Sequence, residues 1–207
     1  MTQRPYQQTR RAEASGATRS KIVLAARDQL LSGRAFTIDA VARRASVTRA
    51  TVYAQFASRD ELRESVFDQL AESGGLHIPE AFTQHDPVLG LRRFVEVFCV
   101  FYGTHRMILR RLNALAIVES DPGAHQHHRN DRRRQALTVL VERVANEAPY
   151  LTDPTNRAAA VSLAHALTSF EFFDQISSES VSESEVPDHV FALVTAALHV
   201  TQEDRSR

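Results

Sequence analysis

The chain has 207 residues, of which 43% are hydrophobic and 24% charged, proportions typical of a folded globular protein with its own core. No run approaches the roughly 18 consecutive apolar residues of a membrane helix, and the polar N-terminus predicts no secretory signal. A single cysteine, Cys99, excludes an intrachain disulfide and favours a reducing compartment, so we expect a cytoplasmic protein.

The zero net charge of the chain conceals an uneven distribution. Residues 1–60 carry eleven Lys and Arg against four Asp and Glu, whereas residues 61–207 carry fourteen against twenty-one. A basic N-terminal segment joined to an acidic remainder indicates a polyanionic partner for the first segment only. Chance segregation of surface charge is the alternative.

The N-terminal segment begins with a polar stretch and continues as a helix. Residues 1–16 are polar and contain three arginines, and we expect them to form a mobile arm. From Thr18 the apolar residues follow helical spacing. That helix is expected to end at Gly33, because glycine commonly follows the last helical turn.

Two short helices joined by a tight turn are predicted next. Thr37 has the position of an N-cap for the first of them, and Thr48 for the second. Ser58 and Glu61 then form a capping box, each satisfying the other's free backbone amide, at the start of a fourth helix. This succession predicts a helix-turn-helix, whose second helix enters the major groove of DNA.

The second short helix has a polar face that we interpret as a DNA-reading face. The hydroxyls of Thr48 and Tyr53 suit phosphate oxygens. Arg49 can form bidentate hydrogen bonds with guanine, and Gln55 can do so with adenine. The methyl group of Thr51 can contact thymine. Small Ala50 allows close approach to the groove, and Arg59 is placed for another phosphate. A plain helical hairpin is the alternative interpretation.

The stretch FTIDAVARRASVTRATVYAQFASRDEL, residues 36–62, resembles the N-terminal signature of the TetR family of bacterial transcriptional regulators. The preceding IVLAARDQLLSGR is similar to that family's first helix, and the resemblance covers residues 18–67. It implies a homodimer that binds a palindromic operator. The homodimer is expected to leave the operator when a small-molecule effector binds the C-terminal domain. The resemblance also implies a phosphate contact by Thr37. The predicted DNA-binding residues are Thr37, Arg43, Thr48, Arg49, Ala50, Thr51, Tyr53, Gln55 and Arg59.

Two positions depart from the family pattern. Ser46 stands where the family usually has a turn glycine, so we expect a left-handed residue with a strain of about 1–2 kcal/mol. Arg59 replaces the commoner lysine, and both can meet a phosphate.

The resulting domain organisation is a mobile arm over residues 1–16, a three-helix helix-turn-helix DNA-binding domain over 17–64, and a larger helical ligand-binding and dimerisation domain over 65–207.

The remainder of the chain also has helical patterns, and no strand-type alternation is visible, so the predicted fold class is all-α. Aromatic and aliphatic residues are concentrated in its middle helices, and with the resemblance they predict a pocket for an apolar or aromatic ligand. Simple core filling is the alternative for each of them. The helices are expected over residues 87–103, 107–118, 124–147, 156–176 and 187–201. The predicted pocket residues are Phe67, Phe94, Phe98, Phe101, Tyr102, Met107, Leu137, Val141, His165 and Phe170.

The last two predicted helices have the pattern of a dimer interface. The helix over 156–176 has apolar residues on two faces and therefore needs two partners, its own core and a second surface. A four-helix interface about a twofold axis is the simplest arrangement, and complete burial in the helix's own domain is the alternative. The predicted interface residues are Val161, Phe172, Val190, Leu193, Val194 and Ala197.

No catalytic pattern stands out, so we expect neither an enzyme nor a bound cofactor or metal. His125 and His128 share a helix face, which is compatible with metal binding. A solvated polar face is the preferred interpretation, and a metal-sensing regulator is the alternative. A helical enzyme for a small apolar substrate is the alternative from another class. We interpret Cys99 as a buried small hydrophobic residue.

Overall fold

The computed structural model describes residues 4–118, 124–146, 148–177 and 181–199, with only the backbone described for residues 4–12, 118 and 124–128. All regular structure in these ranges is helical, which confirms the predicted all-α class. None of the helices described is long and apolar enough to cross a lipid bilayer. The chain divides into two compact units, Met1–Leu70 with Arg110–His125 and Ala71–Leu109 with Gln126–Arg207. The domain boundaries expected from the sequence stay a prediction.

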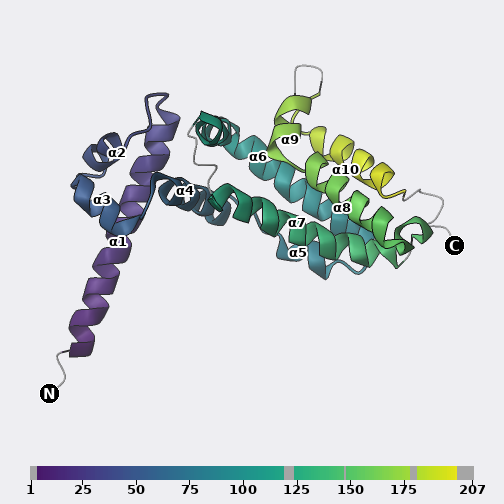
Figure 1. Ribbon diagram of the computed structural model, residues 1–207, viewed down its shortest axis with the longest axis horizontal. Helices are drawn as coiled ribbons and strands as arrows, with labels where there is room; N and C mark the ends of the chain where they lie inside the picture. Colours follow the sequence, from purple (N-terminus) through teal and green to yellow (C-terminus); the bar gives the residue numbers. More distant parts are fainter. Residues whose placement is uncertain (1–3, 119–123, 147, 178–180, 200–207) are drawn as a thin grey trace. The chain divides into compact units, whose positions relative to one another are not determined.

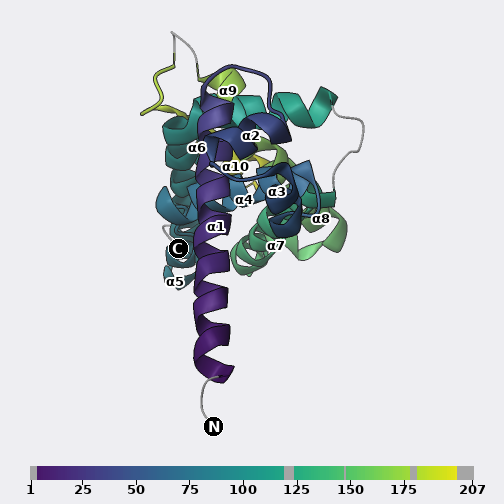
Figure 2. The same cartoon turned by 90° about the vertical axis from the view of Figure 1, so that its left-hand side faces the viewer.

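The first unit is built from a long helix and three shorter ones (Figures 1 and 2). These are α1 (Arg4–Leu31), α2 (Ile38–Arg44), α3 (Arg49–Gln55) and most of α4 (Arg59–Ser73). Residues 110–118, at the end of α6 (Pro87–Val118), also belong to this unit. Helix α2 packs against α1, and α3 packs against α2. Their inward residues are fully buried because they recur at helical spacing and so share one face of each helix. They include Ile22, Val41, Val52, Phe56 and Leu62.

Helix α1 begins at Arg4 and not near Thr18. It therefore includes most of the segment that we expected as a mobile arm. Residues 4–17 are rich in Gln, Arg, Glu and Ala, which are strong helix formers, and Gly16 alone is too small a penalty to end the helix. The mobility of residues 1–16 stays a prediction.

The predicted helix caps are present. The hydroxyl of Thr37 accepts a hydrogen bond from the Ala40 amide at 3.2 Å, and that of Thr48 accepts one from Thr51 at 3.1 Å. Ser58 accepts from the Glu61 amide at 3.0 Å. The return bond differs from the expected box, because the Glu61 carboxylate accepts from the amide of Ala57 at 2.7 Å. The caps fix both ends of the turn that orients α3.

Ser46, in the turn between α2 and α3, has φ of 52°, as the sequence predicts. A side chain in this left-handed conformation is strained, and glycine is not. We expect Ser46→Gly to raise the free energy of unfolding of the first unit by about 0.5–1 kcal/mol, since the relief of strain exceeds the added unfolded-state entropy. Urea unfolding measures this difference. Ser20→Gly in α1 is the matched control and should lower stability by about 0.5–1 kcal/mol; equal losses in both variants would contradict the strain.

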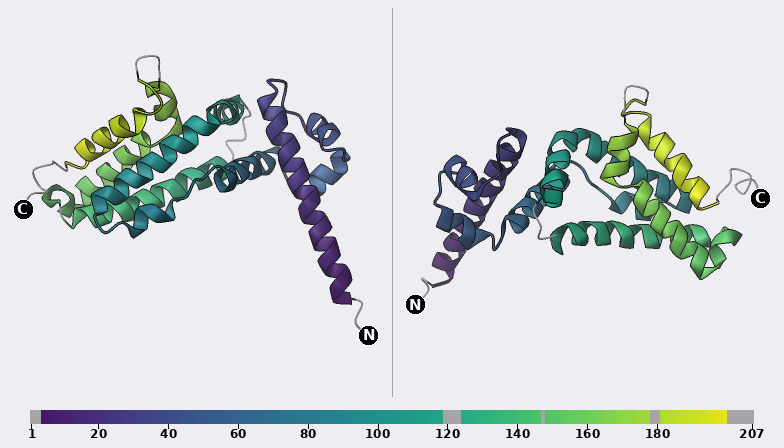
Figure 3. Two further views of the ribbon diagram at one scale, coloured as in Figure 1. Left: turned by 180° about the vertical axis from the view of Figure 1, so that it is seen from behind. Right: turned by 45° about the horizontal axis from the view of Figure 1, so that its top comes forward.

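The second unit is a set of helices around an aromatic core. Helices α8 and α10 lie side by side, which is visible in Figures 1 and 3, and both contact α9. Two short elements, α5 and η1, have no periodic signal in the sequence because each is only about one turn long. The elements are α5 (Pro79–Thr83), α6 (Pro87–Val118, of which residues 87–109 lie in this unit), α7 (Ala124–Ala145), the 3-10 helix η1 (Pro149–Thr152), α8 (Pro154–Leu167), α9 (Phe170–Ile176) and α10 (Val186–Ala197).

Two predicted helix boundaries change in this unit. The helices expected over 87–103 and 107–118 are joined as α6, with non-helical dihedrals at His105 (φ −112°, ψ 16°) marking the junction. The prediction of a single helix over residues 156–176 was wrong, because the chain forms two helices there, α8 and α9, with a break around Ser169. The Ser169 hydroxyl caps α9 by accepting from the Phe172 amide at 3.1 Å. The apolar residues expected on one helix are therefore divided between α8 and α9.

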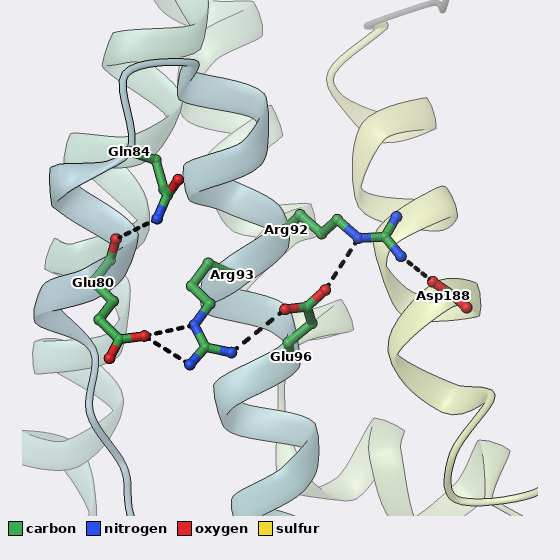
Figure 4. Close-up of polar contacts among 6 residues, drawn as sticks. All are labelled: Glu80, Gln84, Arg92, Arg93, Glu96 and Asp188. Atoms are coloured by element: carbon green, nitrogen blue, oxygen red, sulfur yellow. Dashed lines mark hydrogen bonds and ion pairs between the residues drawn. The ribbon is translucent and has the colours of Figure 1, made fainter.

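Ion pairs tie α5 and α10 to the exposed side of α6 (Figure 4). Arg93 holds Glu80 of α5 through two nitrogens at 2.9 and 2.7 Å, and Glu96 at 3.6 Å. Arg92 pairs with Glu96 at 3.0 Å and with Asp188 of α10. These pairs are largely exposed, so each adds little stability, and their value is in fixing which helices are neighbours.

Candidate nucleic-acid interface

The recognition helix α3 divides cleanly into a buried and an exposed side. Val52 is fully buried, and Phe56 directly after the helix is 2% exposed. On the other side, the Arg49 side chain is 61% exposed and Tyr53 is 43% exposed. Thr48, Arg49 and Ala50 are all exposed at the helix N-terminus, where free backbone amides can also meet a phosphate. The structure therefore presents one end of α3 with most of the predicted DNA-binding residues together.

In the absence of DNA, Arg49 contacts groups on its own unit. Its guanidinium lies 3.6 Å from the Asp39 carboxylate of α2 and 5.6 Å from the centre of the Tyr53 ring. A hydrogen bond with Tyr53, and next the charge of Asp39, raise the pKa of Arg49, so it is permanently cationic. Exposed contacts of this kind are weak and are readily exchanged for a guanine or a phosphate.

The threonine hydroxyls at the start of α3 bond to each other and to the backbone. The Oγ1 atoms of Thr48 and Thr51 are 2.8 Å apart, and Thr51 is half-buried. A hydroxyl that accepts a capping bond still has a proton to donate. Thr48 can therefore cap α3 and donate to a phosphate at the same time.

A basic hollow lies beside α2 in the same unit. It is open to solvent and lined by residues from the end of α1, the following loop and α2. Arg43 and Thr37 were predicted as DNA contacts, whereas Arg34 and Arg44 were left out of the predicted set. The sequence feature that could have indicated Arg34 and Arg44 is the density of arginine in residues 34–44. Helical spacing alone does not show that these arginines lie on one face. The arginines and the cap are positioned to hold a DNA phosphate. The lining residues are Gln29, Arg34, Ala35, Thr37, Ala40, Arg43 and Arg44.

Gln55 is engaged within the protein. Its side-chain amide donates to the Ser15 hydroxyl of α1 at 3.1 Å, and its backbone oxygen accepts from Arg19. The prediction that Gln55 reads adenine therefore has no support from its position, and we leave it out of the proposed interface. Arg59 is exposed at the start of α4, where a phosphate contact stays a prediction.

Comparison with known proteins agrees with this geometry. Residues 33–66 match the family model of the bacterial regulatory proteins of the tetR family. The HTH-type transcriptional regulator EthR of Mycolicibacterium smegmatis is 32% identical over 102 residues, which is 46% of this chain and 46% of that protein. The helix-turn-helix of this chain is that of the TetR family. The alignment with EthR thus covers less than half of that relative's length.

Two solved structures share the fold over about nine-tenths of this chain. A TetR-like transcriptional regulator from Rhodococcus sp. RHA1 has a TM-score of 0.62 at 20% identity, over 89% of this chain and 97% of that one. NalD, the secondary repressor of the MexAB-OprM multidrug efflux pump in Pseudomonas aeruginosa, has a TM-score of 0.56 at 20% identity, over 90% and 96%. The TetR family consists of transcriptional regulators and not of enzymes, as expected from the sequence.

Most of the residues predicted to form a ligand pocket are gathered in the core of the second unit. Met107 is an exception, since it is 59% exposed while Ile108 and Leu109 turn inward after the junction at His105. Phe67 belongs to α4 in the first unit and is half-buried there. The prediction was wrong for Met107, and a pocket role for the others stays a prediction. Phe94, Phe98, Phe101, Tyr102, Leu137, Val141 and Phe170 are buried, and His165 is half-buried.

The predicted dimer residues do not share one exposed face. Val161, Val190 and Val194 are at most 5% exposed within a single chain, so they pack in their own unit and cannot be the contact surface. The inward stripe and the outward stripe of α8 and α10 are both apolar, and periodicity alone does not say which faces out. Leu193 is 43% exposed, while Phe172 and Ala197 are half-buried. The outward residues of the two helices include Ala158, Ala159, Ser162, Leu163 and Ala166 on α8 and Asp188, His189, Ala192, Leu193 and Ala196 on α10.

The histidine pair of the metal alternative, His125 and His128, has side chains outside the described residues. Among the residues whose side chains are described, no group of three His, Cys, Asp or Glu is placed to hold a metal ion. Cys99 is buried, and burial raises the pKa of its thiol to about 12. That thiol is protonated at neutral pH and packs as a small hydrophobic group.

Proposed function

We propose that the protein is a transcriptional repressor that binds a palindromic operator as a homodimer and leaves it when a small apolar or aromatic ligand binds the second unit. The observation that carries the proposal is the exposed N-terminal end of α3, which groups Thr48, Arg49, Ala50 and Tyr53 next to the basic hollow. Dimerisation is supported by the outward apolar face of α8 and α10. Such a regulator acts in the cytoplasm, where the chromosome lies.

Helices α4 and α6 supply the physical basis for coupling, because each contributes residues to both units. A helix shared by two units transmits a change in one to the other. We propose that a ligand in the second unit shifts α4 and so changes the spacing of the two recognition helices of the dimer. If a ligand binds the second unit and leaves operator affinity unchanged, this coupling is wrong.

In vitro selection of random duplexes at near-physiological salt tests the function directly. We expect enrichment of a palindrome whose half-sites are about one helical turn apart. The enriched duplex then serves as the probe for every later measurement. A folded, dimeric protein that enriches no sequence would contradict sequence-specific binding by the ligand-free form.

Two substitutions separate base reading from phosphate contact. We expect Arg49→Ala to lose about 1–3 kcal/mol of discrimination at one base pair of each half-site. Tyr53→Phe removes a phosphate-contacting hydroxyl and should weaken all duplexes by the same factor. Titration of a panel of single-base operator variants measures both. Arg134→Met, an exposed arginine in the second unit, is the control and should change neither. A uniform loss for Arg49→Ala would remove it from the base readers.

A further inference from the structure

Arg133, on α7 in the second unit, is a buried cation with unused hydrogen-bonding capacity. It is only 7% exposed. Its Nη2 atom lies 3.3 Å from the side-chain oxygen of Asn130 and 3.1 Å from Nε2 of His165. Its Nη1 atom is buried and has no hydrogen-bond partner. Burying a guanidinium without satisfying its donors is unfavourable, so this arrangement is costly for the protein on its own.

The groups that contact Arg133 directly are uncharged. Among the residues described, its hydrogen-bond partners are the Asn130 amide oxygen, the His165 imidazole and the Tyr102 hydroxyl, and it forms no ion pair with a carboxylate. Burial, and next the charge of Arg133 itself, lower the pKa of His165. The imidazole is therefore neutral at neutral pH. Its Nε2 lies 3.1 Å from both the guanidinium and the Asn130 backbone oxygen, so it accepts from the first in one tautomer and donates to the second in the other. The positive charge of Arg133 remains uncompensated.

The guanidinium lies beside an aromatic region centred on Tyr102. Burial raises the pKa of Tyr102 to about 12, and the nearby charge of Arg133 opposes that rise. The Tyr102 ring has its centroid 5.6 Å from that of Phe98, 5.5 Å from Phe170 and 5.6 Å from Phe173. These aromatic side chains, except Phe170, line a mostly apolar crevice that is too tight to hold a water molecule, so a ligand enters only by displacing side chains. Arg133 reaches this region through Tyr102 and is not itself part of the crevice lining.

We propose that Arg133 binds the carboxylate of an amphipathic effector whose apolar part enters the aromatic region around Tyr102. A guanidinium pairs with a carboxylate through parallel charge-assisted hydrogen bonds, which would use the free Nη1 donors. One carboxylate neutralises one uncompensated charge, whereas a phosphate dianion would leave excess negative charge in a buried site. The inference rests on the proposed function, because it names the chemical class of the ligand that the regulator senses.

Calorimetric titration of the DNA-free full chain tests the charge preference. The probes are hexanoate, decanoate and benzoate, each compared with the alcohol that replaces its carboxylate, namely hexanol, decanol and benzyl alcohol. We expect at least one acid to bind about 10- to 100-fold more tightly than its alcohol, the effect of one charge-assisted hydrogen-bonding pair. If every acid binds no more tightly than its alcohol, the proposal is wrong.

Variants of the two neighbouring arginines assign the preference to one side chain. Arg133→Met should abolish the acid preference and leave the alcohol affinity unchanged. Arg134→Met should retain the preference, because Arg134 is exposed and contacts Ser162 at 3.0 Å. Ligand-free Arg133→Met should also melt no lower than the parent protein, since the substitution removes an uncompensated buried charge. A retained preference, or a clearly lower melting temperature, would show that the guanidinium has another role.

Operator binding by the same preparations separates this proposal from the proposed function. If the ligand-free protein binds its selected palindrome and no acid is preferred, the regulator stands and the carboxylate proposal fails. If an acid is bound through Arg133 and no duplex is bound, the site stands and the regulatory function fails.

Discussion

Replacing Leu163 by arginine is expected to convert the proposed dimer into monomers and to weaken binding to the palindrome by about 100-fold or more. Leu163 is 51% exposed on α8, next to α10, whose Leu193 is 43% exposed. Most side chains around them on this face are small, and His189, one turn before Leu193, is the larger exception. In an interface about a twofold axis each substitution occurs twice, and both arginines would be buried without a partner.

Sedimentation equilibrium gives the assembly state of this variant, and titration of the palindrome and of a single half-site gives its affinities. The half-site affinity should be unchanged, because α3 is untouched and only the second, linked binding event is lost. Val139→Arg is the matched control, since Val139 is 47% exposed and lies on a different helix, α7. A Leu163→Arg protein that remains dimeric at micromolar concentration would exclude this face as the interface.

The first unit was predictable from sequence to a large extent because its signals are local. Caps at Thr37 and Thr48 are set by side chains three residues from the amides they bind, and the left-handed Ser46 follows from a tight turn with a fixed geometry. The engagement of Gln55 by Ser15 was not predictable, because the two residues are forty positions apart and both types are normally exposed.

The second unit shows what periodicity cannot decide. The segment over residues 156–176 is apolar on two faces, and the sequence pattern does not distinguish a helix with two partners from two helices that break at Ser169. Val161 and Leu163 are equally acceptable as dimer contacts by spacing, and only the packing of α8 on its neighbours assigns the first inward and the second outward. Arg133 is the middle residue of a run of three arginines, residues 132–134, and nothing in that run distinguishes the buried one from its exposed neighbours.

Replacing Arg19 by methionine is expected to destabilise the first unit by about 1–3 kcal/mol and to weaken DNA binding with it. The Arg19 guanidinium lies 4.0 Å from the centre of the Phe56 ring, 3.2 Å from the Glu61 carboxylate and 3.1 Å from the Ser65 hydroxyl. It also donates to the backbone oxygen of Gln55, the last residue of α3. One side chain of α1 thus holds the end of α3 and the first turns of α4.

The size of this effect follows from what the substitution leaves behind. Methionine preserves much of the apolar stem, so the loss is confined to the charged hydrogen bonds and the contact with the ring. Because the Arg19 side chain is 41% exposed, water partly replaces those bonds and the loss stays below that of a buried ion pair. Glu61 still accepts from the Ala57 amide, so the cap of α4 survives.

Hydrogen exchange measured residue by residue distinguishes local from global destabilisation. In Arg19→Met the amides of α3 and of the first turns of α4 should lose protection, while those of α8 and α10 should not change. Lys21→Met is the matched control, because Lys21 is an exposed cation two residues further along α1 and therefore on another face. It should lower DNA affinity only through lost charge, with full protection of α3. Equal protection of α3 in the two variants would show that Arg19 does not hold the recognition helix in place.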